Sequence, residues 1–389
     1  MQGDWPLTLG VALALLALGA LLGELWARLR TPRMPHQSTG ARPHYLLGLN
    51  FLVSHQPDQA IRELSQAVRH ETDALEAYLA LGNLLRESGQ TERAIDVHRS
   101  LLHRPNQSRW EHTQVLFSLA MDFKRAGLID RAASTFQEVV EAESENLAAL
   151  TALQQIAEES GRWEEALRFH QRIQTVSRGA EPDLRPALQT EWGMAVGADD
   201  PAAAAHFQAA LDLRPEYAPA RIGLATCLLQ QGNAEAARDH LEQAIHAGPP
   251  WALAALAVLR RVCRVSGDEA ALGPACDAIL ERDPRAWRAW LELARLRTGR
   301  REFVGAREAL RAALAERPGS LAVQGQLWEL LRLEGEGIEQ FVGLLDEALD
   351  DARLLDPYVC FRCRFKSAEL FARCPHCHAW ETMGGERQD

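Results

Sequence analysis

Four cysteines near the C-terminus have the spacing of a metal site. They form two pairs, Cys360-Phe-Arg-Cys363 and Cys374-Pro-His-Cys377, which ten residues separate. Each Cys-x-x-Cys pair bends the backbone so that both sulfurs face the same way, and two pairs place four thiolates around one tetrahedral ion. A segment of about thirty residues buries too little apolar surface to fold alone, and a bound metal is the usual remedy. The sequence therefore predicts that all four cysteines bind one ion, instead of staying free or forming disulfides.

Four thiolates complete a tetrahedral shell and leave no open position for water or substrate, which favours a structural ion over a catalytic one. Tetrahedral sulfur suits zinc, and it also suits the single iron of a rubredoxin-like site. Iron and zinc therefore both remain open. His376 and His378 flank Cys377. Because the thiolates already fill the shell, we expect these histidines to be exposed loop residues.

The N-terminal end carries a membrane signal. From Leu7 to Gly23 the only polar side chain is that of Thr8, and Trp5 and Trp26 border the stretch. This approaches the ~20 apolar residues that cross a bilayer, and interfacial tryptophan is typical of such borders. A cleaved signal peptide is the alternative, but it needs basic residues before the apolar run and a small-residue cleavage site after it. The sequence therefore predicts an uncleaved anchor.

Basic residues give the orientation of that anchor. Arg28, Arg30 and Arg33 all follow the apolar run and none precedes it, so the positive-inside rule places the bulk of the protein in the cytoplasm. In that reducing compartment we expect thiols or metal ligands, not disulfides. Three further cysteines lie in apolar helical patterns and are interpreted as buried thiols: Cys227, Cys263 and Cys276. A stretch rich in Pro, Gly, Ser and Thr follows the anchor and is predicted to be a flexible linker.

The body of the chain repeats with a period of about 34 residues. Alanines recur at close to this interval, and at several of them a Leu or Phe follows one helical turn later: Ala60, Ala94, Ala132, Ala166, Ala203 and Ala237, with Ala306 after a gap of double length. Glycines mark the turns between paired helices: Gly89, Gly127, Gly161, Gly232 and Gly267. Prolines close units at the same interval: Pro215, Pro249, Pro284 and Pro318. This is the pattern of tetratricopeptide repeats.

Such repeats predict an all-α fold class. The small residues let two helices approach closely, and stacking of neighbouring units buries the apolar faces. We therefore divide the chain into a transmembrane anchor (1–27), a linker (28–43), a tetratricopeptide-repeat superhelix (44–357) of about eight or nine helical pairs, and a small metal-binding domain (358–389). An irregular helical bundle is the alternative, but bundles show no fixed period of this length.

Charge and motifs limit the function classes. Residues 41–357 hold 34 basic and 47 acidic side chains, a balance that disfavours nucleic acid as a partner. The chain contains no Gly-rich phosphate loop, no His-Glu-x-x-His and no Gly-x-Ser-x-Gly. Asp199 and Asp200 precede Pro201 and are explained by helix capping. We therefore expect a binding protein and not an enzyme, because repeat arrays of this kind bind peptide or protein segments.

Together these parts resemble the lipopolysaccharide assembly protein B (LapB, also called YciM) family of Gram-negative bacteria. The residues that carry the resemblance are Tyr45-Leu-Leu-Gly-Leu-Asn-Phe-Leu52, Gln56-Pro-Asp-Gln-Ala60, and the two cysteine pairs with Pro375 and Trp380. Rubredoxin-type knuckles often carry glycine directly after the second cysteine, whereas this chain has Arg364 and His378. A turn with positive φ would be strained at either residue.

The resemblance implies a regulatory role. Members of this family are similar in being inner-membrane adaptors that promote degradation of LpxC, the deacetylase that commits precursors to lipid A, by the membrane protease FtsH. It implies a single-pass protein of the cell inner membrane with its bulk in the cytoplasm, an iron or zinc ion on the four cysteines, and lipopolysaccharide assembly proteins as partners. It leaves a homodimer open.

Two other functions remain as alternatives. The chain is compatible with a general membrane-tethered scaffold for envelope biogenesis enzymes, without a role in proteolysis. It is also compatible with a redox protein that uses a rubredoxin-like iron for electron transfer, although an electron carrier needs no long repeat array.

Overall fold

The computed structural model describes residues 41–70, 75–105, 107–317, 319–334, 358–367 and 369–385. The predicted anchor (1–27) and most of the predicted linker lie outside the described residues. Helix α2 (Ala41–Val53) begins three residues before the predicted start of the array at residue 44. Among the helices of the described ranges, none combines the length and apolar character that crossing a bilayer requires.

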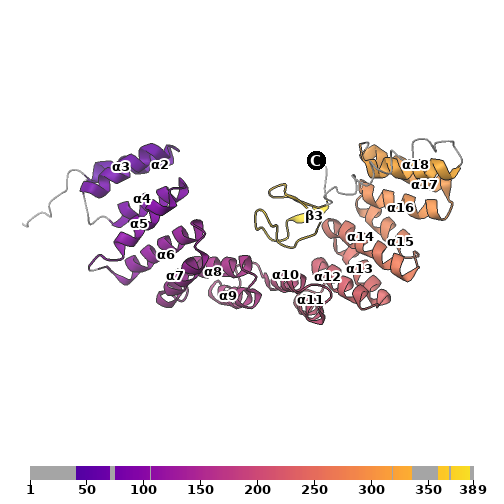
Figure 1. Ribbon diagram of the computed structural model, residues 1–389, viewed down its shortest axis with the longest axis horizontal. Coiled ribbons are helices and arrows are strands. Elements are labelled where there is room, and N and C mark those ends of the chain that lie inside the picture. The colour runs from indigo at the N-terminus through magenta and orange to yellow at the C-terminus, as the bar shows by residue number, and fades with distance from the viewer. Residues whose placement is uncertain are drawn as a thin grey trace, which may run out of the picture. The chain divides into compact units, whose positions relative to one another are not determined.

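The chain divides into two compact units, residues 1–144 and 145–389. In the described part of the first unit, helices follow one another as hairpins whose two helices pack together (Figure 1). These hairpins are α2 with α3 (Pro57–His70), α4 (Leu75–Glu87) with α5 (Thr91–Leu101), and α6 (Arg109–Arg125) with α7 (Ile129–Ala142).

The second unit continues the same pattern and ends in a small sheet. Its hairpins are α8 (Leu147–Glu159) with α9 (Trp163–Val176), α10 (Arg185–Val196) with α11 (Pro201–Leu213), α12 (Ala218–Gln230) with α13 (Ala234–Ala247), α14 (Pro249–Ser266) with α15 (Leu272–Arg282), and α16 (Trp287–Gly299) with α17 (Phe303–Glu316). Helix α18 (Leu321–Glu334) follows, then strands β1 (Tyr358–Cys360), β2 (Lys366–Ser367) and β3 (Met383–Gly385). The rest of the array, which was predicted to extend to residue 357, falls on residues outside the described ranges.

The repeat alanines hold the hairpins together, as the sequence predicted. Those named above are fully buried, and in some hairpins the bulky residue one turn later packs against a glycine of a first helix. Leu64 fills the space beside Gly48, where an added Cβ would lie 2.7 Å from its side chain. Phe207 fills the space between Gly193 and Gly223 in the same way. Larger residues at these glycines would force the paired helices apart.

One repeat escaped the sequence alignment. In α15 the position equivalent to the repeat alanine is Ala275, and Ile279 follows it one turn later; both are buried. The interval from Ala237 to Ala275 is longer than the regular one, and the interval from Ala275 to Ala306 is shorter. The two unequal intervals add up to about two regular repeats. The sequence therefore indicated two units between Ala237 and Ala306, but not the position of the alanine between them.

Two repeats place histidine where the others have Leu, Ile or Phe. His98 in α5 and His170 in α9 are fully buried at this position. A buried ring nitrogen needs a partner, and His98 Nδ1 lies 2.5 Å from Asp122 Oδ2. The other oxygen of Asp122 accepts a 2.9 Å hydrogen bond from Arg86. The seam between α4, α5 and α6 is therefore partly polar, which the repeat pattern did not predict.

The turns inside the hairpins need a left-handed residue. All five predicted turn glycines have positive φ, between 68° and 80°. His55 and Arg301 occupy the same place in two other hairpins with φ of 55° and 62°. The bond pattern is shared: Arg301 donates to Thr298 and the next residue donates to Arg297, as Gly89 and Gln90 donate to Arg86 and Leu85. A side chain with a Cβ is strained there.

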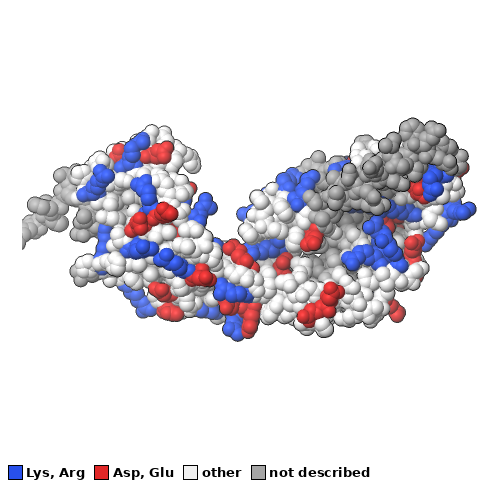
Figure 2. Space-filling view, viewed as in Figure 1, with Lys and Arg blue, Asp and Glu red and all other residues white. Residues whose placement is uncertain are grey.

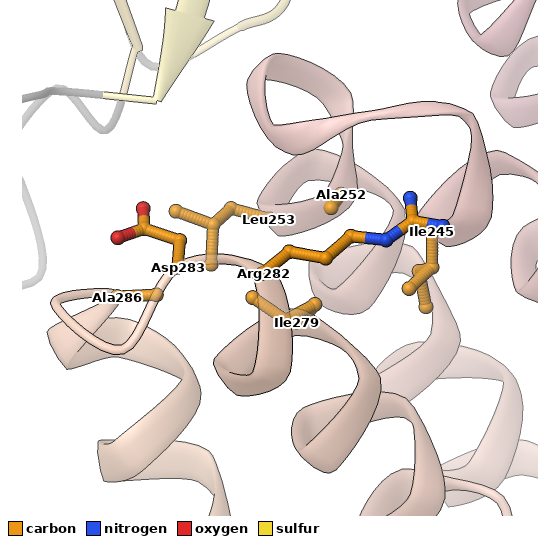
Figure 3. A pocket seen from close by; sticks show the side chains of 7 residues that line it. All are labelled: Ile245, Ala252, Leu253, Ile279, Arg282, Asp283 and Ala286. Carbon is orange, nitrogen blue, oxygen red and sulfur yellow. The ribbon is translucent and has the colours of Figure 1, made fainter.

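A cavity of only about 10 Å³ lies between α13, α14 and α15 (Figure 3). Arg282 stretches along it toward Ile245 and donates a hydrogen bond to the carbonyl of His246. A cation at the C-terminal end of α13 satisfies a free carbonyl and interacts favourably with the helix dipole. The cavity is too small for more than about one water molecule, so its role is packing.

We expect glycine at the two strained turns to stabilise the protein. Arg301→Gly and His55→Gly should each raise the free energy of unfolding by roughly 0.5–1 kcal/mol, because relief of the left-handed strain exceeds the entropy cost of glycine. Urea unfolding followed by circular dichroism measures the change. As a matched control, Gly232→Ala places a Cβ at φ 80° and should lower the stability. Glycine variants that are less stable than the parent would contradict this explanation.

Candidate metal centre

Two knuckles of the same backbone design carry the four cysteines. In the first, the amide of Cys360 donates to the carbonyl of Phe365 and the amide of Arg364 donates to that of Cys360, both at 2.8 Å. The second repeats this pattern between Cys374, Ala379 and His378, with both bonds at 2.9 Å. Because the two loops are equivalent, each presents its pair of sulfurs in the same direction.

The four sulfurs lie together. Their Sγ atoms are all within 4.8 Å of one another. Cys360 and Cys377 are 3.6 Å apart, and so are Cys363 and Cys374. A tetrahedron with metal–sulfur bonds of ~2.3 Å has sulfurs ~3.8 Å apart, whereas a disulfide needs ~2.05 Å. All seven cysteines are free of disulfides. The donor set and its spacing therefore suit one tetrahedral zinc or iron ion.

The neighbouring histidines stay outside this cluster. His376 and His378 are exposed, as the sequence predicted, and the ring of His376 stacks on Phe365 with centroids 6.1 Å apart. Arg364 and His378 do adopt left-handed backbone, with φ of 62° and 54°. The expected strain is therefore present in both knuckles, and the surrounding hydrogen bonds hold it.

The knuckle also prepares a thiol for ionisation. Burial opposes the charged form of Cys360, but the Thr382 hydroxyl and the amides of Arg362 and Cys363 outweigh burial and lower its pKa to about 6. Thr382 Oγ1 lies 3.2 Å from the sulfur. Burial is the main cause that raises the pKa of Cys374. Since thiolates crowd one another, a cation at the centre is what makes four ionised sulfurs compatible.

The sheet around the cysteines is minimal. Strand β1 lies between β2 and β3 and pairs antiparallel with both, with Val359 opposite Lys366 and Gly384. Only a few side chains are buried in its core, chiefly Cys360, Cys374 and Met383. Such a core cannot supply the stability of a domain by itself, which again favours a bound ion as the missing element.

Arg373, the residue before the third cysteine, attaches this domain to the repeats. Its guanidinium lies 3.1 Å from Glu158 of α8, and both side chains are almost fully buried. Its backbone amide donates a 2.9 Å hydrogen bond to Glu191 of α10. Sequence reasoning missed this contact, although Glu158 does carry a signal, because an acid stands where the helical pattern of α8 calls for a buried residue.

A chain of hydrogen bonds extends from Glu158 into the repeat seam. Gln154 donates to Glu158 at 2.7 Å, and its oxygen lies 3.2 Å from His170 Nδ1. The amide of Leu184 donates to His170 Nε2 at 3.0 Å. Because Nε2 accepts, Nδ1 carries the proton and donates to Gln154. Burial lowers the pKa of His170, which favours this neutral ring.

Apolar contacts extend the attachment over the first helices of four hairpins. Trp380 packs against the buried clusters around α8 to α12, which include Ala157, Leu188 and Ala220. Tyr358 and Leu370 pack against the cluster that α12 and α14 share, and β3 contacts α14. At the rim, Arg214 forms a 3.0 Å ion pair with Glu381. The face formed by the first helices α8, α10, α12 and α14 thus holds the metal-binding domain; we call it the first-helix face.

The other sequence-predicted residues fall in the scaffold. Cys227, Cys263 and Cys276 are fully buried, as expected. Desolvation raises the pKa of Cys276 to about 12, so this thiol stays protonated and inert at neutral pH. Asp200 caps α11 and accepts a 2.8 Å hydrogen bond from Ala202, in agreement with the capping interpretation.

We expect the metal and the fold of residues 358–385 to be lost together. Cys363→Ser with Cys377→Ser removes one sulfur from each knuckle, and in small metal domains the binding free energy is largely folding free energy. The variant should lose bound zinc or iron and become protease-sensitive from about Tyr358 onward, with its helical circular dichroism kept. His376→Ala is the matched control and should keep the metal. Wild-type protein without stoichiometric zinc or iron would contradict the site.

We expect Glu191 to make the attachment weaken at alkaline pH. Burial raises its pKa from 4.5 to about 7, against the lowering effects of the Arg373 and Ala372 amides and the Arg373 charge, while the negative charge of Glu158 raises it further. The folded protein therefore binds this proton more tightly than the unfolded chain, so the stability contribution falls as pH rises from about 4.5 through 7.

Denaturant unfolding at pH 5.5 and pH 8 tests this with Glu191→Gln, whose amide oxygen still accepts the backbone hydrogen bonds. The stability of the variant should not fall through the ionisation of residue 191 as pH rises. At pH 8 its free energy of unfolding should exceed that of wild type by roughly 1–3 kcal/mol. Metal binding depends on pH in both proteins, so the difference between them isolates Glu191. An equal pH dependence in the two would rule out this role.

Comparisons with known proteins agree with both parts of the structure. A tetratricopeptide repeat family model matches residues 45–108, 117–180 and 274–320, and another matches 200–260. A model described as rubredoxin metal binding domain matches residues 358–384. Among solved structures, a tetratricopeptide repeat protein from Parabacteroides merdae is 13% identical with a TM-score of 0.37, covering 76% of this chain and 99% of that chain. MamA from Desulfovibrio magneticus is 18% identical with a TM-score of 0.31, covering 53% and 94%.

Curated relatives match along most of the chain. Lipopolysaccharide assembly protein B of Escherichia coli K12 is 24% identical over 362 residues, which cover 87% of this chain and 88% of the relative. The protein of the same name from Haemophilus influenzae is 24% identical over 359 residues, with the same coverage. In the described residues the repeat hairpins come first and the four-cysteine domain follows them. The chain is a tetratricopeptide-repeat protein with a C-terminal rubredoxin-type metal-binding domain, and it is similar along most of its length to lipopolysaccharide assembly protein B.

Proposed function

We propose that the chain is a membrane-tethered adaptor of lipopolysaccharide assembly, in which Cys360, Cys363, Cys374 and Cys377 hold one structural ion. The observation that carries the proposal is the attachment of the four-cysteine domain to the first-helix face through Arg373 and Trp380. Repeat arrays bind partners on extended faces of this kind, and here the metal-binding domain forms part of the face. The role of the curated relatives in lipopolysaccharide assembly supports the same process for this chain.

A structural ion fits the site better than a catalytic one. Four sulfurs complete a tetrahedral shell, so a bound ion would keep no position for a substrate. Cys360 and Cys374 are fully buried, which limits access further. The ion would instead fix the knuckle that carries Arg373. This reasoning favours action by binding over catalysis, and zinc and iron serve it equally well.

A membrane tether would raise the concentration of the array next to its partners. The apolar stretch from Leu7 to Gly23 and the arginines at 28, 30 and 33 support a single-pass anchor in the inner membrane with the repeats in the cytoplasm. Confinement to the membrane surface increases the effective concentration toward other membrane-bound proteins without any new contact. The anchor therefore matters for function more than for folding of the repeats.

We further propose, from the family resemblance, that the partners are the protease FtsH and the lipid A deacetylase LpxC. The adaptor would then present LpxC to the protease and limit lipid A synthesis. A general scaffold for lipopolysaccharide assembly enzymes is the competing function, and it differs in leaving the lifetime of LpxC unchanged.

A pulse-chase measurement of LpxC distinguishes these functions. Depletion of the chain should lengthen the half-life of the deacetylase and raise lipopolysaccharide. Arg373→Ala should have the same effect, because it leaves Glu158 buried without its counter-ion, at a cost of roughly 3–5 kcal/mol, and so releases the metal-binding domain. Arg168→Ala removes an exposed ion pair with Glu164 and should have no effect.

The half-life of LpxC distinguishes the adaptor from the general scaffold. An LpxC half-life that does not respond to depletion favours the general scaffold. A half-life that responds to depletion but not to Arg373→Ala would separate the attachment from the regulation. A chain that begins at Arg42 tests the tether, because full activity at native expression would remove that part of the proposal.

A further inference from the structure

The last described repeats differ in charge from the rest of the chain. The whole protein has a net charge of −11, but residues 249–334 hold fourteen arginines against eleven acidic residues. Lys and Arg side chains gather over the region of α14 and α16 in Figure 2. A local positive field inside an acidic protein attracts negatively charged ligands to one place.

A cavity of about 700 Å³ opens within this region of the second unit. Its walls come from the first helices α14 and α16, from α18, and from the α14–α15 hairpin turn. Its polar lining residues are Arg260, Arg264, Glu269, Glu292, Arg295 and Gln326. Helix α14 contacts α16, and α16 contacts α18, so the cavity extends from α14, which also contacts the metal-binding domain, onto the first helices that follow it.

The sequence places these side chains together by helical periodicity. Arg260 and Arg264 are four residues apart and lie on the same side of α14, and Glu292 and Arg295 are three apart on α16. Stacking of the two helices brings both pairs to one cavity. None of the four is needed for the repeat pattern, which depends on alanine and leucine positions.

Glu292 shows how this cavity holds a carboxylate. Its side chain is largely buried, and one oxygen, Oε2, lies 3.3 Å from the guanidinium of Arg260 and 3.3 Å from that of Arg295. Arginine pairs with carboxylates in this way because its planar group offers several donors. The site therefore already contains one carboxylate of the chain between two arginines.

Unused donors remain after that pairing. The Nε of Arg260 is buried and has no hydrogen-bond partner within the described ranges. Arg264 lines the cavity and is exposed; the part of the chain that the structure describes offers it no ion pair. A buried donor without a partner is costly, so a ligand that supplies an acceptor here would gain free energy.

We propose that this cavity binds an acidic segment of a partner protein, with a carboxylate of that segment on Arg264 and near Arg260. Glu269 and Glu292 reduce the charge of the polar lining to a single net positive, which suits a carboxylate better than a doubly charged phosphate. The large volume and the amide of Gln326 suit an extended peptide, whose backbone needs hydrogen-bond partners. The site lies apart from the metal centre and goes beyond the proposed function, because it would bind such a segment whatever the process served.

The test uses the full chain and a short fluorescein-labelled peptide in which glutamate alternates with alanine. Fluorescence anisotropy should show binding that weakens as salt increases, and a peptide with glutamine in place of glutamate should bind much more weakly. Arg264→Glu should weaken the acidic peptide roughly tenfold or more, and Arg264→Lys should retain part of the affinity. Because Arg264 is exposed and forms no ion pair with any described residue, its substitution should leave the thermal midpoint unchanged.

Arg311→Glu on α17 is the matched control, since this arginine is exposed and does not line the cavity; it should bind like wild type. Equal binding of the glutamate and glutamine peptides, or an Arg264→Glu variant with wild-type affinity, would overturn the proposal. Displacement of the peptide by millimolar inorganic phosphate would assign the site to phosphate instead.

Residues 335–357 contain seven acidic residues and one arginine. A peptide that binds only after these acids are changed to amides would show that the chain's own segment fills the cavity, and would also overturn the proposal. The measurement reports on the cavity alone, so its failure leaves the LpxC half-life test unaffected.

Discussion

The buried pair between Arg373 and Glu158 is the constraint on which the second unit depends. Two charges taken out of water are stable only when their geometry is correct and their remaining donors and acceptors are satisfied. Here Gln154 supplies a second hydrogen bond to Glu158, and the backbone of Arg373 is fixed by Glu191. Arg373 directly precedes Cys374, so its position follows from the fold of the second knuckle. Attachment to the repeats therefore depends on the geometry of the second knuckle, and that geometry depends on metal binding.

This linkage explains why residue 170, in the seam between repeats, is a histidine. A Leu or Phe at residue 170 would pack as well as its counterparts in other hairpins, but it would leave Gln154 without its partner. His170 holds Gln154, Gln154 holds Glu158, and Glu158 holds Arg373. In the first unit His98 plays a comparable part with Asp122 and Arg86. Both polar seams fix one arrangement of neighbouring helices, at the expense of some apolar packing.

Much of the architecture could be predicted from local patterns. The repeat period, the turn glycines and the cysteine spacing each depend on residues that are close in sequence, so their physics is local. The attachment could not be predicted in the same way, because Glu191 and Arg373 are 182 residues apart. Glu158 offered a partial signal as an acid within a buried pattern, but nothing in the sequence names its partner. Ala275 was missed for a smaller reason, since its spacing from both neighbouring repeat alanines departs from the regular period.

The left-handed residues in the knuckles also could not be fully understood from the sequence. A turn with positive φ was expected to be strained at Arg364 and His378, and both residues do have positive φ in the structure. Each cost is about 1–2 kcal/mol, which is small beside the binding free energy of a structural ion. A domain held by metal tolerates non-glycine residues at these positions more readily than a domain held by a small apolar core.

Helix α14 contributes both to the first-helix face and to the arginine-lined cavity. Trp251 and Val258 of this helix line a cavity together with Tyr358 and Leu370 of the metal-binding domain, and Arg260 and Arg264 line the arginine-lined cavity. The chain as a whole is acidic, whereas the cavity on α14, α16 and α18 is lined by three arginines and two glutamates. Local geometry decides which charge a repeat face can bind, because screening confines each field to about 8–10 Å at cellular salt.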